Sequence, residues 1–409
     1  MSASPSDERM PHPHVSQAAH PLRVSRFAVT AAYAAQGLGY AVVVTSLPAL
    51  KERQGVDDTM VSILVLGVAL MAAVGSVLAN AVAVHWGSRS ALSLGLLVQG
   101  IALPLIALPT PFAVFAAAFA LFGVGLGCVD AGVAMQGVAV QRRHGHPLLG
   151  RFFAALTAAA IAGALLVSAV AATALAAGIA LTVAGVAAAT VGIVGRWFFL
   201  RDVPVDDALP ATERARLPRA GIWAFGFVIL AVFVVDSAVS TWSTVYLHDD
   251  LATAAWVAPL GYAAYQAAVL VTRLVTDRLV GAWGRARLVA IAVVISAAGL
   301  LAVVLLPFAV AAVLGFALAG VATGVLVPVT FGAAGDLSPE HSDQVIARVN
   351  LFNYAGAILG AVVVGLLADG PGLAVAFALP ALALFAVLWV LPRFRATPAA
   401  MSARSGSPR

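Results

Sequence analysis

Charged residues are scarce in this sequence of 409 amino acids. Asp, Glu, Lys and Arg together fill 10% of the positions, whereas apolar residues fill 62%. A water-soluble domain of this length would expose large apolar surfaces with such a composition. The sequence therefore predicts a chain surrounded by lipid and argues against a soluble enzyme.

Cysteine is nearly absent, since Cys128 is the one example. This excludes an intramolecular disulfide and a multi-cysteine metal cluster, so we expect Cys128 to be a small packed residue in a helix. No HExxH or GxSxG motif occurs, and no GK[ST] follows Gly123, Gly125 and Gly127, which we interpret as helix-packing glycines. We expect no metal and no cofactor.

The net charge of +5 does not indicate a nucleic-acid partner. A nucleic-acid binder gathers its basic residues on one folded face, whereas here they lie in short loops between apolar runs. Residues 1–22 are polar and rich in Pro and His, without the apolar core of a signal peptide, and we interpret them as a disordered cytoplasmic tail.

Long apolar runs are abundant. A membrane-spanning helix needs about 20 apolar residues, because each residue rises about 1.5 Å across a hydrocarbon layer about 30 Å thick. Breaks at charges, Pro and Gly divide the chain into twelve such runs, near 26–48, 59–83, 91–109, 112–139, 148–171, 175–198, 221–246, 253–277, 288–306, 308–334, 345–368 and 372–392. The predicted fold class is an all-α integral membrane protein of two six-helix bundles, 23–200 and 220–395, joined by a cytoplasmic linker, 201–219, and followed by a cytoplasmic tail, 396–409.

The positive charges predict the orientation, because short loops rich in Lys and Arg remain in the cytoplasm. With twelve alternating helices, only Lys51 and Arg53 fall outside. The arginines at 89, 142, 143, 201, 214, 216, 219, 278, 285, 287, 393, 395, 404 and 409 share the other side. We therefore expect a multi-pass protein of a bacterial inner membrane with both termini cytoplasmic.

The two halves repeat a short motif. Trp86-Gly87 follows the second run and is followed by Arg89, and Trp283-Gly284-Arg285 follows the eighth. Matching motifs at the same helix number indicate parallel repeats.

The chain resembles the major facilitator superfamily of transporters over nearly its whole length. The run RLVTDRLVGAWGR at 273–285 is similar to that superfamily's signature between the second and third helices of a half, and the first-half counterpart keeps Gly87 and Arg89 but has Val84 at the acidic position. Within the superfamily, GLGCVDAGVAMQG at 125–137 and DSAVSTWSTVYL at 236–247 most resemble the fucose-permease-like branch. Ala134 and Gly150 depart from the branch pattern, where asparagine and histidine are common.

Two carboxyl groups, of Asp130 and Asp236, fall deep inside predicted helices. Placing a charge there costs about 3 kcal/mol, and burial favours the protonated form. No Lys or Arg lies at comparable depth, so protonation or a cationic ligand would neutralise them. The resemblance to fucose permeases implies a functional acid at Asp130, and we predict proton coupling by Asp130 and Asp236. A protonated structural Asp is the alternative for each.

Further polar and aromatic residues are candidates for a substrate cavity. Tyr33, Gln36 and Tyr40 share one face of the first helix. The other candidates are Gln136, Ser240, Trp242, Tyr262, Tyr265, Gln266, Thr323, Asn350 and Asn353. Packing alone is the alternative for each aromatic residue.

The signature motif suggests a cytoplasmic gate. The superfamily pattern implies that Asp277 pairs with arginines and with the N-terminal end of the eleventh helix to close the cytoplasmic face. The predicted gate residues are Arg273, Asp277, Arg278, Gly284, Arg285, Gly87 and Arg89. A solvated ion pair without a gating role is the alternative.

These observations predict a proton-coupled secondary transporter that moves a small organic solute by alternating access, as a monomer in the lipid bilayer. The branch resemblance suggests uptake of a sugar-like solute. Two alternatives remain: a proton-driven efflux antiporter, although residues 147–172 lack the Gly-Pro motif that such antiporters usually show, and a non-transporting membrane sensor.

Overall fold

The computed structural model describes residues 19–145, 148–171, 173, 176–201, 217–338, 341–368, 370 and 372–395. The predicted linker at 201–219 and the predicted tails at 1–22 and 396–409 lie largely or entirely outside these residues. The described residues are almost entirely helical, and they confirm the all-α prediction.

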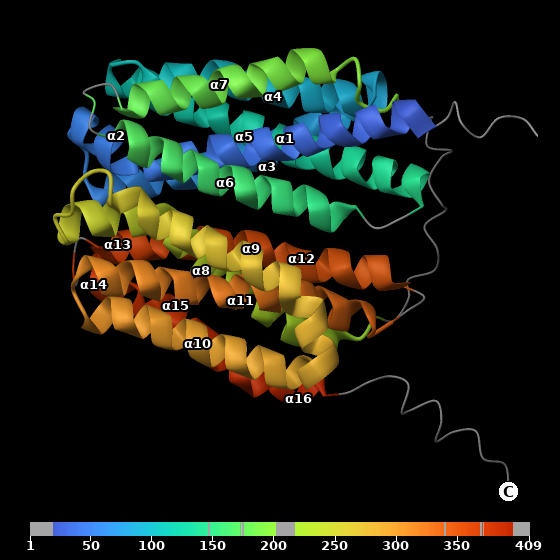
Figure 1. The fold of residues 1–409 in the computed structure, drawn as a ribbon, viewed down its shortest axis with the longest axis vertical. Coiled ribbons are helices and arrows are strands. Elements are labelled where there is room, and N and C mark those ends of the chain that lie inside the picture. The colour runs from blue at the N-terminus through green and yellow to red at the C-terminus, as the bar shows by residue number, and fades with distance from the viewer. Residues whose placement is uncertain are drawn as a thin grey trace, which may run out of the picture.

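The described residues of the first half form six long helices and one short helix. The long helices are α1 (Ala19–Thr45), α3 (Asp58–Trp86), α4 (Ser88–Ala107), α5 (Phe112–His144), α6 (Leu149–Val170) and α7 (Ala176–Gly195). The short helix α2 (Leu47–Gln54) lies between α1 and α3. Figure 1 shows these helices side by side in the blue to green layer.

The second half repeats this order. Its segments are α8 (Arg219–Val245) with the π-turn η1 (Tyr246–Asp250), α9 (Ala258–Trp283), α10 (Arg285–Leu305) and α11 (Ala309–Gly335). Next comes α12 (Ser342–Ile358), which continues through η3 (Leu359–Val363) into α13 (Val364–Ala368). The last span is assembled from α14 (Leu373–Ala376), α15 (Ala378–Val387), η4 (Leu388–Val390) and α16 (Leu391–Phe394). These helices form the yellow to red layer of Figure 1.

The same helix pairs pack together in each half. In the first half α3 packs on α5, α1 on α6, α4 on α5 and α4 on α7. In the second half α9 packs on α11, α8 on α12, α10 on α11 and α10 on α15. The turns between the paired repeats also match, since Gly87 and Gly284 both precede a helix with positive φ, 85° and 75°, and ψ near 155°. Only glycine adopts this conformation without strain, which explains the repeated Trp-Gly motif.

Eleven helical segments of the described chain are long and apolar enough to cross a membrane. The remaining long helix, α9, has 26 residues but carries Arg273, Asp277 and Arg278. It packs between α8, α11 and α6 like the other spans, and we count it as the twelfth.

Several predicted helix ends differ from the structure. The first run does not continue to residue 48, because α1 ends at Thr45 and α2 follows after Ser46 with Pro48 in its first turn. The eighth run is displaced, since α9 begins at Ala258 and ends at Trp283 instead of spanning 253–277. At the N-terminus, α1 begins at Ala19, within the predicted tail.

Glycines allow close helix contacts in the first half. A Cβ atom at Gly127 would lie 1.8 Å from the carbonyl oxygen of Ala72, and one at Gly123 would lie 2.6 Å from that of Val68. Both contacts join α5 to α3. Gly125 faces α4, where a Cβ atom would lie 2.8 Å from Gln99. The prediction of helix-packing glycines is confirmed.

Candidate transport cavity

A cavity of about 680 Å³ lies between the two halves. It is lined from the first half by α1, α5 and α6, and from the second half by α8, α9, α11 and α12. Of the predicted site residues, those lining it are Gln36, Tyr40, Asp130, Asp236, Ser240, Tyr262, Gln266, Arg273, Asp277, Thr323, Asn350 and Asn353. Gly150 at the start of α6 and Asp277 near the end of α9 also line it, so the cavity extends toward the arginine-rich end of the bundle, where α3 and α9 end.

Asp130 lies on α5 with its side chain exposed to this cavity. The amide of Gln36, on α1, donates a hydrogen bond of 2.7 Å to Oδ1 of Asp130, and the amide of Gln99, on α4, donates one of 2.8 Å to Oε1 of Gln36. Gln99 is fully buried. This chain of amides fixes the carboxyl group in place while leaving it accessible from the cavity.

Asp236 lies across the cavity on α8 and is half-buried. Its Oδ1 accepts a hydrogen bond of 2.6 Å from the hydroxyl of Tyr265, which also lies 2.8 Å from Oγ1 of Thr323. Tyr265 is itself fully buried, so it stands behind Asp236 and does not line the cavity. Tyr40 lines the same cavity as both carboxyl groups.

Arg273 changes the charge balance expected from the sequence. It is half-buried, lines the same cavity and interacts electrostatically with Asp236. The expectation that no Lys or Arg lies at comparable depth is therefore wrong. The cause is the displaced end of α9, because Arg273 lies ten residues before Trp283, about 15 Å along the helix.

Besides Tyr265, three predicted cavity residues lie elsewhere. Tyr33 is buried against Phe152 and Phe153 of α6, with ring centroids 5.4 Å from each. Gln136 is fully buried and binds Ser88 and both backbone groups of Leu200. Trp242 is buried within the second half and donates a hydrogen bond of 2.7 Å to the carbonyl of Ala361. None of the three lines the cavity.

The predicted gate residues do not form the expected ion pairs in this structure. Asp277 and Arg278 are exposed, and Asp277 forms no ion pair within 4 Å among the ion pairs found in the described residues. Arg285, at the start of α10, instead pairs at 2.5 Å with Asp336, which follows α11 in the same half. Gly87 and Gly284 form the turns before α4 and α10, and Arg89 lies in the first turn of α4. The pairing expected for Asp277 is therefore not formed in this state.

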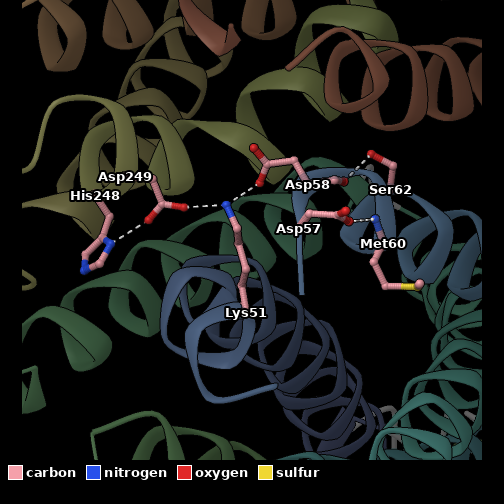
Figure 2. Close-up of polar contacts among 7 residues, drawn as sticks. All are labelled: Lys51, Asp57, Asp58, Met60, Ser62, His248 and Asp249. Atoms are coloured by element: carbon pink, nitrogen blue, oxygen red, sulfur yellow. Dashed lines mark hydrogen bonds and ion pairs between the residues drawn. The ribbon is translucent and has the colours of Figure 1, made fainter. Parts of the chain in front are cut away.

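The opposite end of the bundle, called the α2 end here, is held together by polar contacts between the halves. Lys51, on α2, lies 2.6 Å from Asp249 on η1 and 2.5 Å from Asp58 at the start of α3, and Asp249 also contacts His248 (Figure 2). Ser168, on α6, donates a hydrogen bond of 2.6 Å to the carbonyl of Trp256 in the second half. These contacts close the α2 end while the cavity extends toward the arginine-rich end.

The charge of Lys51 is stabilised by its partners. Burial disfavours the ammonium form, but the hydrogen bonds and negative charges of Asp249 and Asp58 outweigh this effect and raise the pKa of Lys51. Lys51 therefore stays charged at neutral pH. Since Asp58 belongs to the same half as Lys51, only one of these two ion pairs of Lys51, the pair with Asp249, joins the two halves.

The sequence profile of the Major Facilitator Superfamily matches residues 29–317 and, in a second match, residues 250–408. The chain belongs to the Major Facilitator Superfamily. It is 27% identical over 373 residues to an uncharacterised MFS-type transporter of Yersinia pestis, covering 91% of this chain and 96% of that protein. It is 26% identical to the membrane protein MosC of Rhizobium meliloti, covering 82% of each chain.

Solved superfamily structures share the fold. The nucleoside transporter NupG superposes with a TM-score of 0.69 at 14% identity, covering 91% of this chain and 99% of its own. FucP in its outward conformation superposes with a TM-score of 0.62 at 14% identity, covering 92% and 100%. Membership in this superfamily makes the chain a membrane transporter and not an enzyme.

Some residues at or next to the cavity between the two halves could not be predicted from the sequence. Gln99 donates a hydrogen bond to Gln36. The sequence feature that could have indicated Gln99 is its single amide side chain within the apolar run 91–109. Thr157 and Phe153 of α6 line the cavity but carry no pattern that separates them from packing residues.

Proposed function

We propose that this chain is a proton-coupled secondary transporter that moves a small organic solute by alternating access of two six-helix halves. One observation carries the proposal: the carboxyl groups of Asp130 and Asp236, one from each half, line a single cavity that extends toward one end of the bundle. Intramembrane carboxyl groups are costly, and they commonly serve ion pathways and proton relays. The complete cavity lies within one chain, and we propose that the monomer is the working unit.

Protonation of Asp130 is the proposed coupling step. Its carboxyl group is held by Gln36 but exposed to the cavity, so it can exchange a proton with water. When Asp130 is neutral, closing the cavity around it costs less than enclosing a charge. Asp236 shares the cavity with the cation of Arg273 and accepts a hydrogen bond from Tyr265. We therefore assign the proton to Asp130 first and propose Asp236 as the second site.

The arginine-rich end is proposed to be cytoplasmic. It carries Arg89, Arg142, Arg143, Arg278 and Arg285, and positive loops remain in the cytoplasm. The cavity then faces inward in this structure, in a bacterial inner membrane with both termini cytoplasmic. Closing of this end would bring Asp277 and Arg278 toward the other half, which is the proposed gating role of the signature motif.

The first test is transport by the purified protein in liposomes that contain a pH-sensitive dye. L-fucose represents sugars, and uridine represents nucleosides because NupG is a nucleoside transporter. We expect addition of a transported solute to cause proton flux in the same direction. Flux in the opposite direction would favour the efflux antiporter. No flux with a broad panel of sugars, nucleosides, amines and carboxylates would favour a non-transporting sensor.

The second prediction concerns the Lys51–Asp249 ion pair, which joins the two halves at the α2 end. We expect Asp249→Asn to open the α2 end more often, because it removes an ion pair between the halves that is worth about 1 kcal/mol, or about fivefold in the population of the open state. A cysteine at Thr244, buried at this end, would report opening through its rate of reaction with an impermeant thiol reagent in a Cys128→Ala background.

Asp58→Asn is the matched control for this prediction, because it removes an ion pair of the same lysine within one half. We expect it to change the labelling rate by less than about twofold. Equal acceleration by both variants would show that the contact with Asp249 has no special role in closing the α2 end.

A further inference from the structure

A second cavity, called the outer pocket here, lies at the α2 end between the same two halves. It has a volume of about 510 Å³. From the first half it is lined by α1, α2, α6 and the ends of neighbouring helices, and from the second half by Thr244, His248, Ala255 and Ala258. The transport cycle proposed above assigns no role to this pocket.

The outer pocket is aligned with the central cavity. On α8, Ser240 lines the central cavity and Thr244 the outer pocket, and on α9 the corresponding residues are Tyr262 and Ala258. Four residues separate each pair, which is about 6 Å along a helix. The wall between the two cavities is therefore about one helical turn thick on these helices.

Two hydroxyl groups in the wall of the outer pocket have no hydrogen-bond partner. Ser46 and Thr244 are each 1% exposed, come from opposite halves and line the pocket, and their side-chain oxygens are unpartnered. The neighbouring hydroxyl of Thr45 is satisfied by the carbonyl of Ala41. Burying an unpaired hydroxyl is unfavourable, and serine and threonine in helices usually find a backbone partner. Within the described residues, nothing satisfies the hydroxyls of Ser46 and Thr244 in this state.

The other polar groups of the outer pocket limit the ligand's chemistry. Arg53 already donates to the carbonyls of Ile106 and Ala107, at 2.6 and 2.7 Å, and His248 contacts Asp249. Glu52 also lines the pocket, so its negative charge and the positive charge of Arg53 offset each other and favour neither an anion nor a cation. Hydroxyls can both donate and accept hydrogen bonds, so Ser46 and Thr244 match the hydroxyls of an uncharged solute.

We propose that the outer pocket is a second binding site on the transport pathway, where Ser46 and Thr244 hydrogen-bond the hydroxyl groups of a small uncharged polyhydroxylated solute. The site is used when the α2 end opens, before the solute passes one helical turn to the central cavity. This inference rests on the proposed transport function and adds a substrate class to it.

A reporter cysteine at Ala49 tests the site without measuring transport. Ala49 is exposed and lines the outer pocket, and Cys128→Ala removes the native thiol. L-fucose, D-mannitol and uridine serve as uncharged probes, with lactate and choline as an anion and a cation. We expect at least one uncharged probe to slow the reaction of this cysteine with an impermeant thiol reagent by about threefold or more. Protection by lactate or choline alone would overturn the proposed ligand class.

Variants of the two hydroxyls then locate the contact. Ser46→Ala and Thr244→Val should each raise the probe concentration for half-protection by about three- to tenfold, as expected for one lost hydrogen bond. The matched control is Ser243→Ala, because Ser243 is also buried and unpartnered but does not line the pocket. An equal shift with Ser243→Ala, or no shift with Ser46→Ala and Thr244→Val, would overturn the assignment.

The same probes separate this inference from the proposed function. If the liposome assay shows transport but no probe protects the Ala49 cysteine, the outer site is wrong and the transport function stands. If a probe protects the cysteine but the unmodified protein does not transport that probe, the pocket's place on the transport pathway is overturned, whereas the transport function is tested separately by the broad solute panel.

Discussion

Asp130→Asn is expected to abolish proton-driven accumulation of the solute while solute exchange continues. The amide cannot take up and release a proton, but it keeps the shape of the side chain and can still contact Gln36. A gradient of one pH unit supplies about 1.4 kcal/mol per proton, enough for about tenfold accumulation of an uncharged solute. In the variant this ratio should fall to one.

The measurement compares net accumulation under a pH gradient with exchange of labelled solute at equal concentrations, in liposomes of the same protein. Asp130→Glu is the matched control, because it retains a carboxyl group at a position exposed to the cavity. We expect it to keep accumulation in part. Undiminished accumulation by Asp130→Asn would remove this residue from the coupling mechanism.

The membrane fold could be predicted from the sequence because it depends on simple patterns. Apolar runs long enough to span a bilayer give the helices, and the repeated Trp-Gly turns mark corresponding positions in the two halves. The end of α9 could not be predicted in the same way. Its charges at Arg273, Asp277 and Arg278 resemble a loop, yet the helix continues to Trp283, and Arg273 and Asp277 face a cavity instead of lipid.

Residues of the cavity were only partly predictable, because a helical pattern gives the face of a residue but not what covers that face. Tyr33 shares a face with Gln36 and Tyr40, but at its level α6 packs against α1 and fills the space with Phe152. Trp242 lies six residues after Asp236, which turns it by about 240° around the helix and points it into its own half.

The same geometry applies on α5. Gln136 lies six residues after Asp130 and points toward Ser88 and Leu200 instead of the cavity. The depth of Arg273 was predicted wrongly for a different reason. The eighth helix was predicted to end at residue 277, whereas α9 ends at Trp283. The carboxyl groups themselves were predictable because a charge within an apolar run is rare and has few alternative explanations.

Gly127→Ala should prevent the first half from folding stably. Without a hydrophobic force between helices in lipid, their association depends on close van der Waals packing, which small residues permit. An added Cβ atom would lie 1.8 Å from the backbone carbonyl of Ala72, and a backbone atom cannot move aside as a flexible side chain can. The helices α3 and α5 must then separate, which also displaces Asp130 three residues further along α5. We expect a cost of at least about 3 kcal/mol.

Size-exclusion chromatography and thermal unfolding of the detergent-solubilised protein would measure this effect. Gly67→Ala is the matched control, because a Cβ atom at Gly67, on the partner helix α3, would meet no atom within 4 Å. The control should give a single sharp peak and an unchanged unfolding temperature, whereas Gly127→Ala should aggregate or unfold at a much lower temperature. Equal behaviour of the two variants would mean that α3 and α5 do not pack at this distance, and the placement of Asp130 in the cavity would lose its structural support.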